Sequence, residues 1–167
     1  MSRHLNKDFA DAYHRVLALS GQVEEMVNKA IRALMGRNRE LASEVIAMDE
    51  EIDRAEVQIE DECLKMLALH QPVAADLRRL TTMMKINNDL ERIADLACNI
   101  AERCHDLVEF EAYPIPERLR EMCAASIAMV RESIDAFVNL DVEAAYQVIH
   151  KDDAIDEMNV EIIDQVT

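Results

Sequence analysis

Apolar residues recur three and four positions apart along three long stretches of this 167-residue chain, and this spacing restricts the fold more than any other feature. The stretches run from Phe9 to Met35, from Leu41 to Leu69 and from Leu77 to Leu107. They are separated by the polar segments GRNRE and HQPVAAD. Because a 3.6-residue period places such side chains on one face of a helix, we predict three long amphipathic helices.

Residue usage also favours helix over sheet. The chain has two glycines, three prolines, no tryptophan and 4% aromatic residues, so it lacks the residues that turns and strands prefer. The segment AYPIPE, from Ala112 to Glu117, breaks the helical pattern, since residues that precede proline avoid the α conformation. We expect a fourth helix from about Glu117 to Asn139 and a fifth from Asp141 onward, in an all-α protein.

The spacing further predicts which residues form the seams between helices. Positions that alternate three and four apart are typical of left-handed bundle packing. In the third helix this alternation selects Met83, Ile86, Leu90, Ile93, Ala97, Ile100, Cys104 and Leu107. In the second helix it selects Met48, Ile52, Ala55 and Ile59.

An internal repeat relates each residue from 26 to 64 to the residue 103 positions later. Without a gap, 14 of these 39 pairs are identical, including Asp49 with Asp152 and Asp53 with Asp156. The register is kept through the predicted turns near Asn38 and Asp141. We interpret the chain as a tandem repeat of up-down-up three-helix bundles.

The second copy contains only two of the three helices of the repeating unit. We predict a first bundle over residues 1–111, a linker over 112–116 and the first two helices of a second, incomplete bundle over 117–167. Either the chain is truncated or a partner supplies the missing helix, and the repeat predicts a complete protein roughly 40–45 residues longer.

Two carboxylate pairs are expected to face each other in the first bundle. Glu91 and Asp95 are one helical turn apart, as are Asp49 and Asp53. In an antiparallel hairpin centred near Pro72, Asp49 lies at the height of Asp95, and Asp53 lies at the height of Glu91. On the second helix the acids at 49, 53, 56 and 60 each follow a predicted seam residue, about 100° around the helix. Four carboxylates should therefore converge beside the seam.

Such a cluster suits a hard divalent cation or iron, because carboxylate oxygens are the ligands these ions prefer. A solvated helix face with no ion explains the same acids about equally well. The enzyme alternative is a ferritin-like di-iron oxidase, for which Glu102-x-x-His105 and Asp11-x-x-His14 offer the two motif halves. Those histidines should lie roughly 30–40 Å apart, which disfavours one shared site.

The charge balance and the cysteines exclude other classes of function. A net charge of −16 disfavours nucleic acid and anionic lipid as partners. No apolar run approaches a membrane span and no signal peptide is present, so we expect a cytoplasmic protein.

The four cysteines show no metal-binding spacing. Cys63, Cys98, Cys104 and Cys123 have no CxxC spacing and are predicted to be reduced, packed thiols. No catalytic triad or glycine-rich phosphate loop is present, which favours a protein that is not an enzyme.

Three segments together resemble the PhoU family of phosphate-uptake regulators: KINNDLERIAD, DLRRL from Asp76 to Leu80, and MDEEIDRAE from Met48 to Glu56. The resemblance covers essentially the whole chain. It implies tandem three-helix bundles in a cytoplasmic negative regulator of phosphate uptake and phosphate-starvation signalling, peripheral to the inner membrane. The implied partners are the phosphate ABC transporter, a sensor histidine kinase and a second copy in a homodimer.

The same resemblance implies binding of one or more metal ions, with iron, zinc, magnesium or manganese as candidates. The implied metal ligands are Asp49, Asp53, Glu91, Asp95 and the repeat copies Asp152 and Asp156. The copies differ in ligand supply, since Glu56 and Glu60 correspond to Asn159 and Ile163.

Overall fold

The computed structural model describes residues 3–107 and 115–166, and in this part of the chain every regular element is an α-helix. The helices are α1 (Arg3–Gly36), α2 (Arg39–His70), α3 (Ala74–Leu107), α4 (Glu117–Asn139) and α5 (Val142–Val166). The predicted all-α class and the number and order of the helices are confirmed. No described helix combines the length and the apolar character that a membrane span needs.

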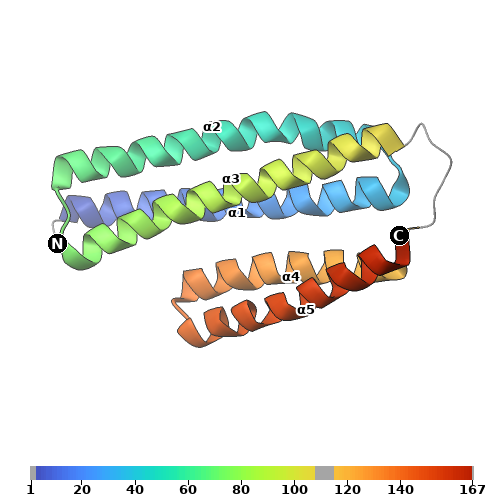
Figure 1. Ribbon diagram of the computed structural model, residues 1–167. Helices are drawn as coiled ribbons and strands as arrows, with labels where there is room; N and C mark the ends of the chain where they lie inside the picture. The colour runs from blue at the N-terminus through green and yellow to red at the C-terminus, as the bar shows by residue number, and fades with distance from the viewer. Residues whose placement is uncertain (1–2, 108–114, 167) are drawn as a thin grey trace. The chain divides into compact units, whose positions relative to one another are not determined.

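The chain divides into two compact units, unit 1 over Met1–Asp106 and unit 2 over Leu107–Thr167. Unit 1 contains α1, α2 and α3, which lie alongside one another (Figure 1). Unit 2 contains the hairpin of α4 and α5. The predicted boundary at residue 111 and the start of the predicted linker lie outside the described residues.

Unit 1 is held together by apolar seams whose members alternate three and four residues apart. The fully buried side chains of α1 include Val16, Leu19, Val23 and Met26, each at most 1% exposed. On α3 the buried stripe consists of Leu80, Met83, Asn87, Leu90, Ala94, Ala97, Ala101 and Cys104. Burying such stripes contributes roughly 25 cal/mol per Å² of apolar surface, which is the main stabilisation of a bundle this rich in aliphatic residues.

The register predicted for α3 was half right. Met83, Leu90, Ala97 and Cys104 are buried as expected, but Ile86, Ile93 and Ile100 are only half-buried and Leu107 is 48% exposed. Their neighbours Asn87, Ala94 and Ala101 occupy the buried positions instead. Small alanines at the inner positions leave room for the adjacent helices to approach, which pushes the bulkier isoleucines to the edges of the seam.

The register predicted for α2 was also half right, since Ile52 and Ile59 are buried as predicted. The buried residues of α2 are Ala42, Val45, Ile52, Ile59, Cys63 and Met66, whereas Met48 and Ala55 are half-buried. The three-and-four alternation of this set passes through positions 49 and 56. Asp49 and Glu56 therefore border the seam of α2 and are half-buried, whereas Asp53 and Glu60 are exposed as the predicted stripe requires.

The turn that joins α1 to α2 is built again between α4 and α5, 103 residues later. Arg37 and Leu140 both adopt a left-handed backbone, with φ of 49° and 52°. The amide of Asn38 donates to the carbonyl of Ala33 at 2.9 Å, and that of Asp141 donates to the carbonyl of Ala136 at 2.9 Å. The internal repeat is thus present in the backbone as well as in the sequence.

In each hairpin the second helix, α2 or α5, begins with the same kind of side-chain cap. Asn38 Oδ1 accepts a hydrogen bond from the amide of Leu41 at 2.9 Å. Asp141 Oδ1 accepts one from the amide of Ala144 at 3.0 Å. Each cap satisfies an amide that the first turn of a helix leaves without an intrahelical partner.

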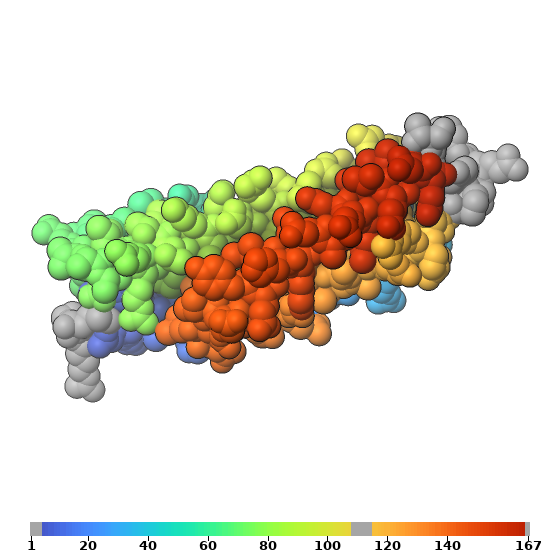
Figure 2. Space-filling model, turned by 60° about the horizontal axis from the view of Figure 1, so that its bottom comes forward, coloured from blue at the N-terminus to red at the C-terminus, as the bar shows by residue number. Residues whose placement is uncertain are grey.

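Unit 2 has far fewer buried residues than unit 1. Ala136 and Val148 are its buried apolar residues among those described, at 5% and 8% exposure. In the space-filling view, α5 runs in orange and red along the face turned toward the viewer (Figure 2). The large exposed apolar residues of this hairpin are Leu140, Val142, Tyr146, Ile149, Val160 and Ile163.

Candidate metal centre

Three of the predicted acidic residues converge between α2 and α3. Asp49, Asp53 and Asp95 each place one ligand atom within 4.8 Å of the other two. In the described part of the chain this is the one group of three or more potential ligands at such distances. The expected facing of these two helices is confirmed, and Asp95 is at the predicted height.

Glu91 lies close enough to this group for their charges to interact. Burial raises the pKa of Glu91, and the carboxylates of Asp95 and Asp53 raise it further. Burial likewise raises the pKa of Asp49, with Asp53 and Asp95 adding to the effect. Burial and the neighbouring negative charges both disfavour the ionised form of these acids. Keeping either acid ionised therefore costs free energy.

Cys98 lies beside this group and interacts with Asp49, whereas the sequence interpretation placed it only among packed thiols. It follows Asp95 by three residues and its thiol bonds to the carboxylate of Asp49, which partly offsets the rise in the pKa of that acid. Burial, together with the charges of Asp49 and Glu102, raises the pKa of Cys98 to about 11. The spacing of Asp95, Cys98 and Glu102 puts all three on one face of α3, and that spacing was the available signal.

One turn further along the hairpin, Glu56 meets Asn87. Asn87 is fully buried, and its Nδ2 donates to the backbone oxygen and to Oε1 of Glu56, both at 3.0 Å. Burial raises the pKa of Glu56, with Glu60 and Asp53 contributing. A buried amide paired with a carboxylate fixes the register of α2 against α3 at this level.

Two oxygens in this region are buried without a hydrogen-bond partner among the described residues, Oδ1 of Asp49 and Oδ1 of Asn87. A buried acceptor that lacks a donor costs about 1–3 kcal/mol, and a cation satisfies such an oxygen. The donor set of carboxylates with one orphaned oxygen therefore fits the divalent or ferric ion that the resemblance implies.

The other two predicted ligands lie apart from this centre. Asp152 and Asp156 are on α5 in unit 2, and both are exposed. They are the repeat copies of Asp49 and Asp53, but their ligand atoms are not gathered with a third described carboxylate, histidine or cysteine.

A serine–histidine pair at the start of α2 resembles a nucleophile with its base. Ser43 Oγ lies 2.8 Å from His105 Nε2, and Arg39 Nε donates to His105 Nδ1 at 3.1 Å. Because Nδ1 accepts, the proton of the neutral ring is on Nε2, so His105 donates to Ser43. Ser43 Oγ in turn donates to the backbone oxygen of Arg39 at 3.1 Å. This arrangement does not activate the serine as a nucleophile.

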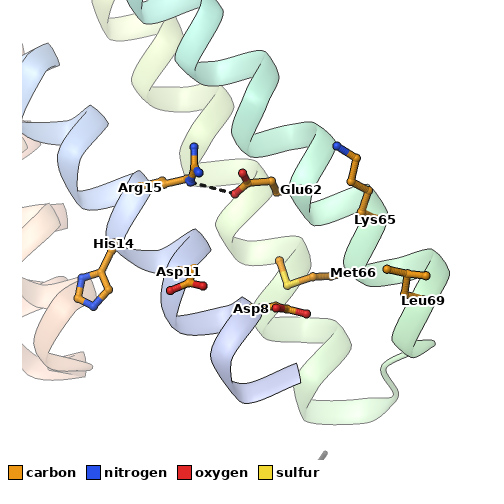
Figure 3. Close-up of a pocket in the computed structure, with 8 residues that line it drawn as sticks. All are labelled: Asp8, Asp11, His14, Arg15, Glu62, Lys65, Met66 and Leu69. Atoms are coloured by element: carbon orange, nitrogen blue, oxygen red, sulfur yellow. Dashed lines mark ion pairs between the residues drawn. The ribbon is translucent and has the colours of Figure 1, made fainter. Parts of the chain in front are cut away.

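The second half of the proposed di-iron motif lies elsewhere in unit 1. His14 is exposed and lines a hollow of about 450 Å³ between α1 and α2. Figure 3 shows the ion pair of Arg15 with Glu62 across this hollow, at 3.2 Å, and the ring of His14 directed away from it. Since His105 contacts Ser43 near the other end of α2, the helical rise places the two histidines about 30 Å apart.

Comparison with known proteins identifies one matching family. The family described as "PhoU domain" matches residues 16–104 and 119–167, which lie in unit 1 and unit 2 respectively. The matched ranges include the carboxylates of both repeat copies.

The relatives share a common description. The chain is 40% identical over 154 residues to the "Phosphate-specific transport system accessory protein PhoU homolog" of Aquifex aeolicus, which covers 92% of this chain and 70% of that protein. It is 38% identical over 141 residues to the PhoU homolog 1 of Thermotoga maritima. The aligned region is 84% of this chain and 61% of that protein. The chain thus spans 61 to 70% of the length of these relatives.

Two solved structures have the same fold. The crystal structure of PhoU from Pseudomonas aeruginosa superposes with a TM-score of 0.93 at 34% identity, covering 96% of this chain and 77% of that one. The phosphate transport system regulatory protein PhoU from Streptococcus pneumoniae gives a TM-score of 0.88 at 28% identity, covering 95% and 74%.

Proposed function

We propose, because the chain belongs to the PhoU family, that it is an accessory protein of a phosphate-specific transport system and carries a cation between α2 and α3. The family relationship supports the first part, since its relatives are named as accessory proteins of that system. The convergence of Asp49, Asp53 and Asp95 supports the second part.

The bound cation would act by joining two helices that otherwise repel each other locally. Carboxylates from α2 and α3 share one level of the bundle, and burial makes their charge costly. A divalent ion between them would replace that repulsion with attraction and satisfy Asp49 Oδ1. Cation occupancy would therefore set how firmly α3 is held on α2, and with it the surface that unit 1 offers to partners.

The partners in this proposal are the phosphate ABC transporter and a sensor histidine kinase, which the protein would contact from the cytoplasm to lower phosphate uptake and starvation signalling. The protein would act by contact, as a homodimer, without catalytic turnover. The separation of the two histidines favours this function over a carboxylate-bridged oxidase.

A calorimetric titration with Mn²⁺ and with Zn²⁺ tests the cation site. We expect binding to the wild-type protein, a loss of at least tenfold in affinity for Asp95→Asn, and an unchanged affinity for the matched variant Asp156→Asn. At a free concentration 100 times the Kd, binding should raise the free energy of unfolding by about 2.7 kcal/mol. Equal binding by both variants would show that the ion, if any, is held elsewhere.

Phosphate uptake tests the regulatory role independently of the ion. In bacteria whose own copy of this protein is deleted, we expect the wild-type chain to reduce radiolabelled phosphate uptake and Asp95→Asn to do so less effectively. Uptake that is identical with and without the wild-type chain would contradict the accessory role, whatever the metal titration shows.

A further inference from the structure

The end of unit 1 where α2 turns into α3 exposes apolar side chains. Leu69 in the last turn of α2 is 77% exposed, Val73 in the connection is 75% exposed, and Leu77 in the first turn of α3 is 40% exposed. We infer that this end of unit 1 is a docking surface for a protein segment in which acidic residues flank apolar ones. This turn surface consists of Leu69, Val73, Leu77, Lys7, Lys65 and Arg78.

The backbone of the α2–α3 connection is strained. Gln71 and Ala74 are not glycines, yet their φ values are 45° and 49°, a left-handed conformation that costs roughly 1–2 kcal/mol per residue. The amide of Gln71 donates to the carbonyl of Leu67 at 3.1 Å, and Pro72 is buried. Neither feature requires an aliphatic side chain at position 73. An exposed Val73 on a connection of fixed shape is instead suited to contact with another molecule.

Two cations lie beside the apolar residues. Lys65 precedes Leu69 by four residues, so both lie on one face of α2 (Figure 3), and Arg78 directly follows Leu77. Both cations are exposed, and neither forms an ion pair with a described residue. In a chain with a net charge of −16, unpaired cations next to exposed aliphatic side chains favour an acidic partner.

The start of α1 adds a third cation. His70 Nε2 lies 2.8 Å from Asp8 Oδ2, so α1 begins at the same end of unit 1 as the α2–α3 connection (Figure 1). Lys7 is exposed and also forms no ion pair with a described residue. Asp76 is half-buried in the first turn of α3, where the helix N-terminus favours a carboxylate. Asp8 and Asp76 are thus stabilised by other groups, which leaves the three cations available to a partner.

The opposite end of unit 1 lacks this arrangement. Arg39 Nε donates to His105 Nδ1 at 3.1 Å, and Arg103 pairs with Asp106 at 3.6 Å. These two cations are therefore engaged within unit 1. Arg103 provides a matched control for a charge change at Arg78, because both are exposed arginines on α3.

A protein segment suits the turn surface better than an anionic membrane does. A membrane is extended, so its charge would meet the net charge of −16 that the whole chain carries. A narrow acidic segment would meet the turn surface alone.

Site-specific cross-linking in bacteria that express the full chain tests the inference. Photoreactive benzoylphenylalanine in place of Val73 should cross-link to a protein segment that mass spectrometry maps to acidic residues flanking apolar ones. The control position is Leu96, which is 63% exposed on α3. Benzoylphenylalanine at that position should not label the same segment.

A synthetic peptide with the sequence of the mapped segment measures the contributions of charge and apolar surface. The double variant Lys65→Glu, Arg78→Glu should bind it about tenfold more weakly than wild type, because attraction becomes repulsion at two positions. Leu69→Ser should also weaken binding, whereas Arg103→Glu and Leu96→Ser should not. All these side chains are exposed, so the midpoint of thermal unfolding should not change.

Four results would overturn the inference. They are labelling from position 73 no stronger than from position 96, labelling of a second copy of this chain, peptide binding that the double variant leaves unchanged, and binding to phosphatidylglycerol vesicles in place of a protein segment. None of them depends on a cation at Asp49, Asp53 and Asp95 or on phosphate uptake. The turn surface and the proposed function can therefore fail separately.

Discussion

The α1–α2 hairpin and the α4–α5 hairpin are two copies of one design in different surroundings. Their turns have the same backbone geometry and the same cap. Ala42 is fully buried, whereas its copy Ala145 is exposed. Asp49 is half-buried, whereas Asp152 is exposed. Unit 1 has a third helix, α3, which covers the seam of its hairpin, and the described part of unit 2 consists of two helices.

This difference shows which properties are local and which depend on a neighbouring helix. The turn and the cap require only residues close in sequence, so both copies form them. Burial, raised acid pKa values and the gathering of three carboxylates require α3, which supplies Asp95, Glu91 and Cys98. The same aspartate is therefore a candidate ligand in one copy and a solvated acid in the other.

The largest contrast should appear in core packing. Ile52 is 1% exposed and its copy Ile155 is half-buried. We expect Ile52→Ala to lower the free energy of unfolding of unit 1 by about 2–5 kcal/mol, because it leaves a cavity in a closed seam. Ile155→Ala should cost unit 2 about 1 kcal/mol, since it removes less buried surface. Native-state hydrogen exchange measures the two units separately.

Equal costs at these two positions would contradict the comparison. A large loss at Ile155 would mean that the second seam is covered in solution, by a partner or by another copy. Ile52→Val is the conservative control, with an expected cost of about 1 kcal/mol.

The caps should behave alike in the two hairpins. Asn38→Ala and Asp141→Ala each remove one side-chain acceptor from a helix start, so each should cost about 1 kcal/mol. Asn38→Ser and Asp141→Asn retain an acceptor and should recover most of that loss. A cost confined to one hairpin would show that the cap, too, depends on the third helix.

Helix positions and the repeat could be predicted from the sequence, because both follow from the spacing of residues along the chain. The fourth helix begins at Glu117 and ends at Asn139 as predicted. The offset of 103 residues reproduces the turn at Leu140 and the cap at Asp141. The predicted height of Asp95 opposite Asp49 followed from the length of the hairpin connection alone.

Rotation about the helix axis could not be predicted equally well. The sequence predicted Met48 in the α2 seam, but in the structure Met48 and Asp49 are both half-buried, so the seam passes between them. The same uncertainty hid Cys98, which looked like one more packed thiol. A register that differs by one residue turns a helix by about 100°, which is enough to move an acid from the surface into a seam.

The smallest effect should appear in the pH dependence of the free energy of unfolding, measured with a chelator present. Folding raises the pKa of Asp49, so the folded protein holds its proton more tightly than the unfolded chain does. The stabilisation from this proton is complete below the unfolded pKa and is lost as pH rises through the folded pKa. At neutral pH, Asp49→Asn should therefore be more stable than wild type by about 0.5–1 kcal/mol, because the substitution removes a partly buried charge and its repulsion by Asp53 and Asp95.

The variant Asp152→Asn provides the matched control, since its side chain is exposed and faces one carboxylate neighbour on its own helix. Its gain should be about 0.2–0.5 kcal/mol at neutral pH. Thermal unfolding between pH 4 and pH 8 should show the two variants converging on wild type at the acid end. When Mn²⁺ replaces the chelator, Asp49→Asn should become less stable than the wild-type protein, because the wild-type aspartate then binds the ion. An advantage of Asp49→Asn that survives added Mn²⁺ would mean that repulsion between these carboxylates is not what the ion relieves.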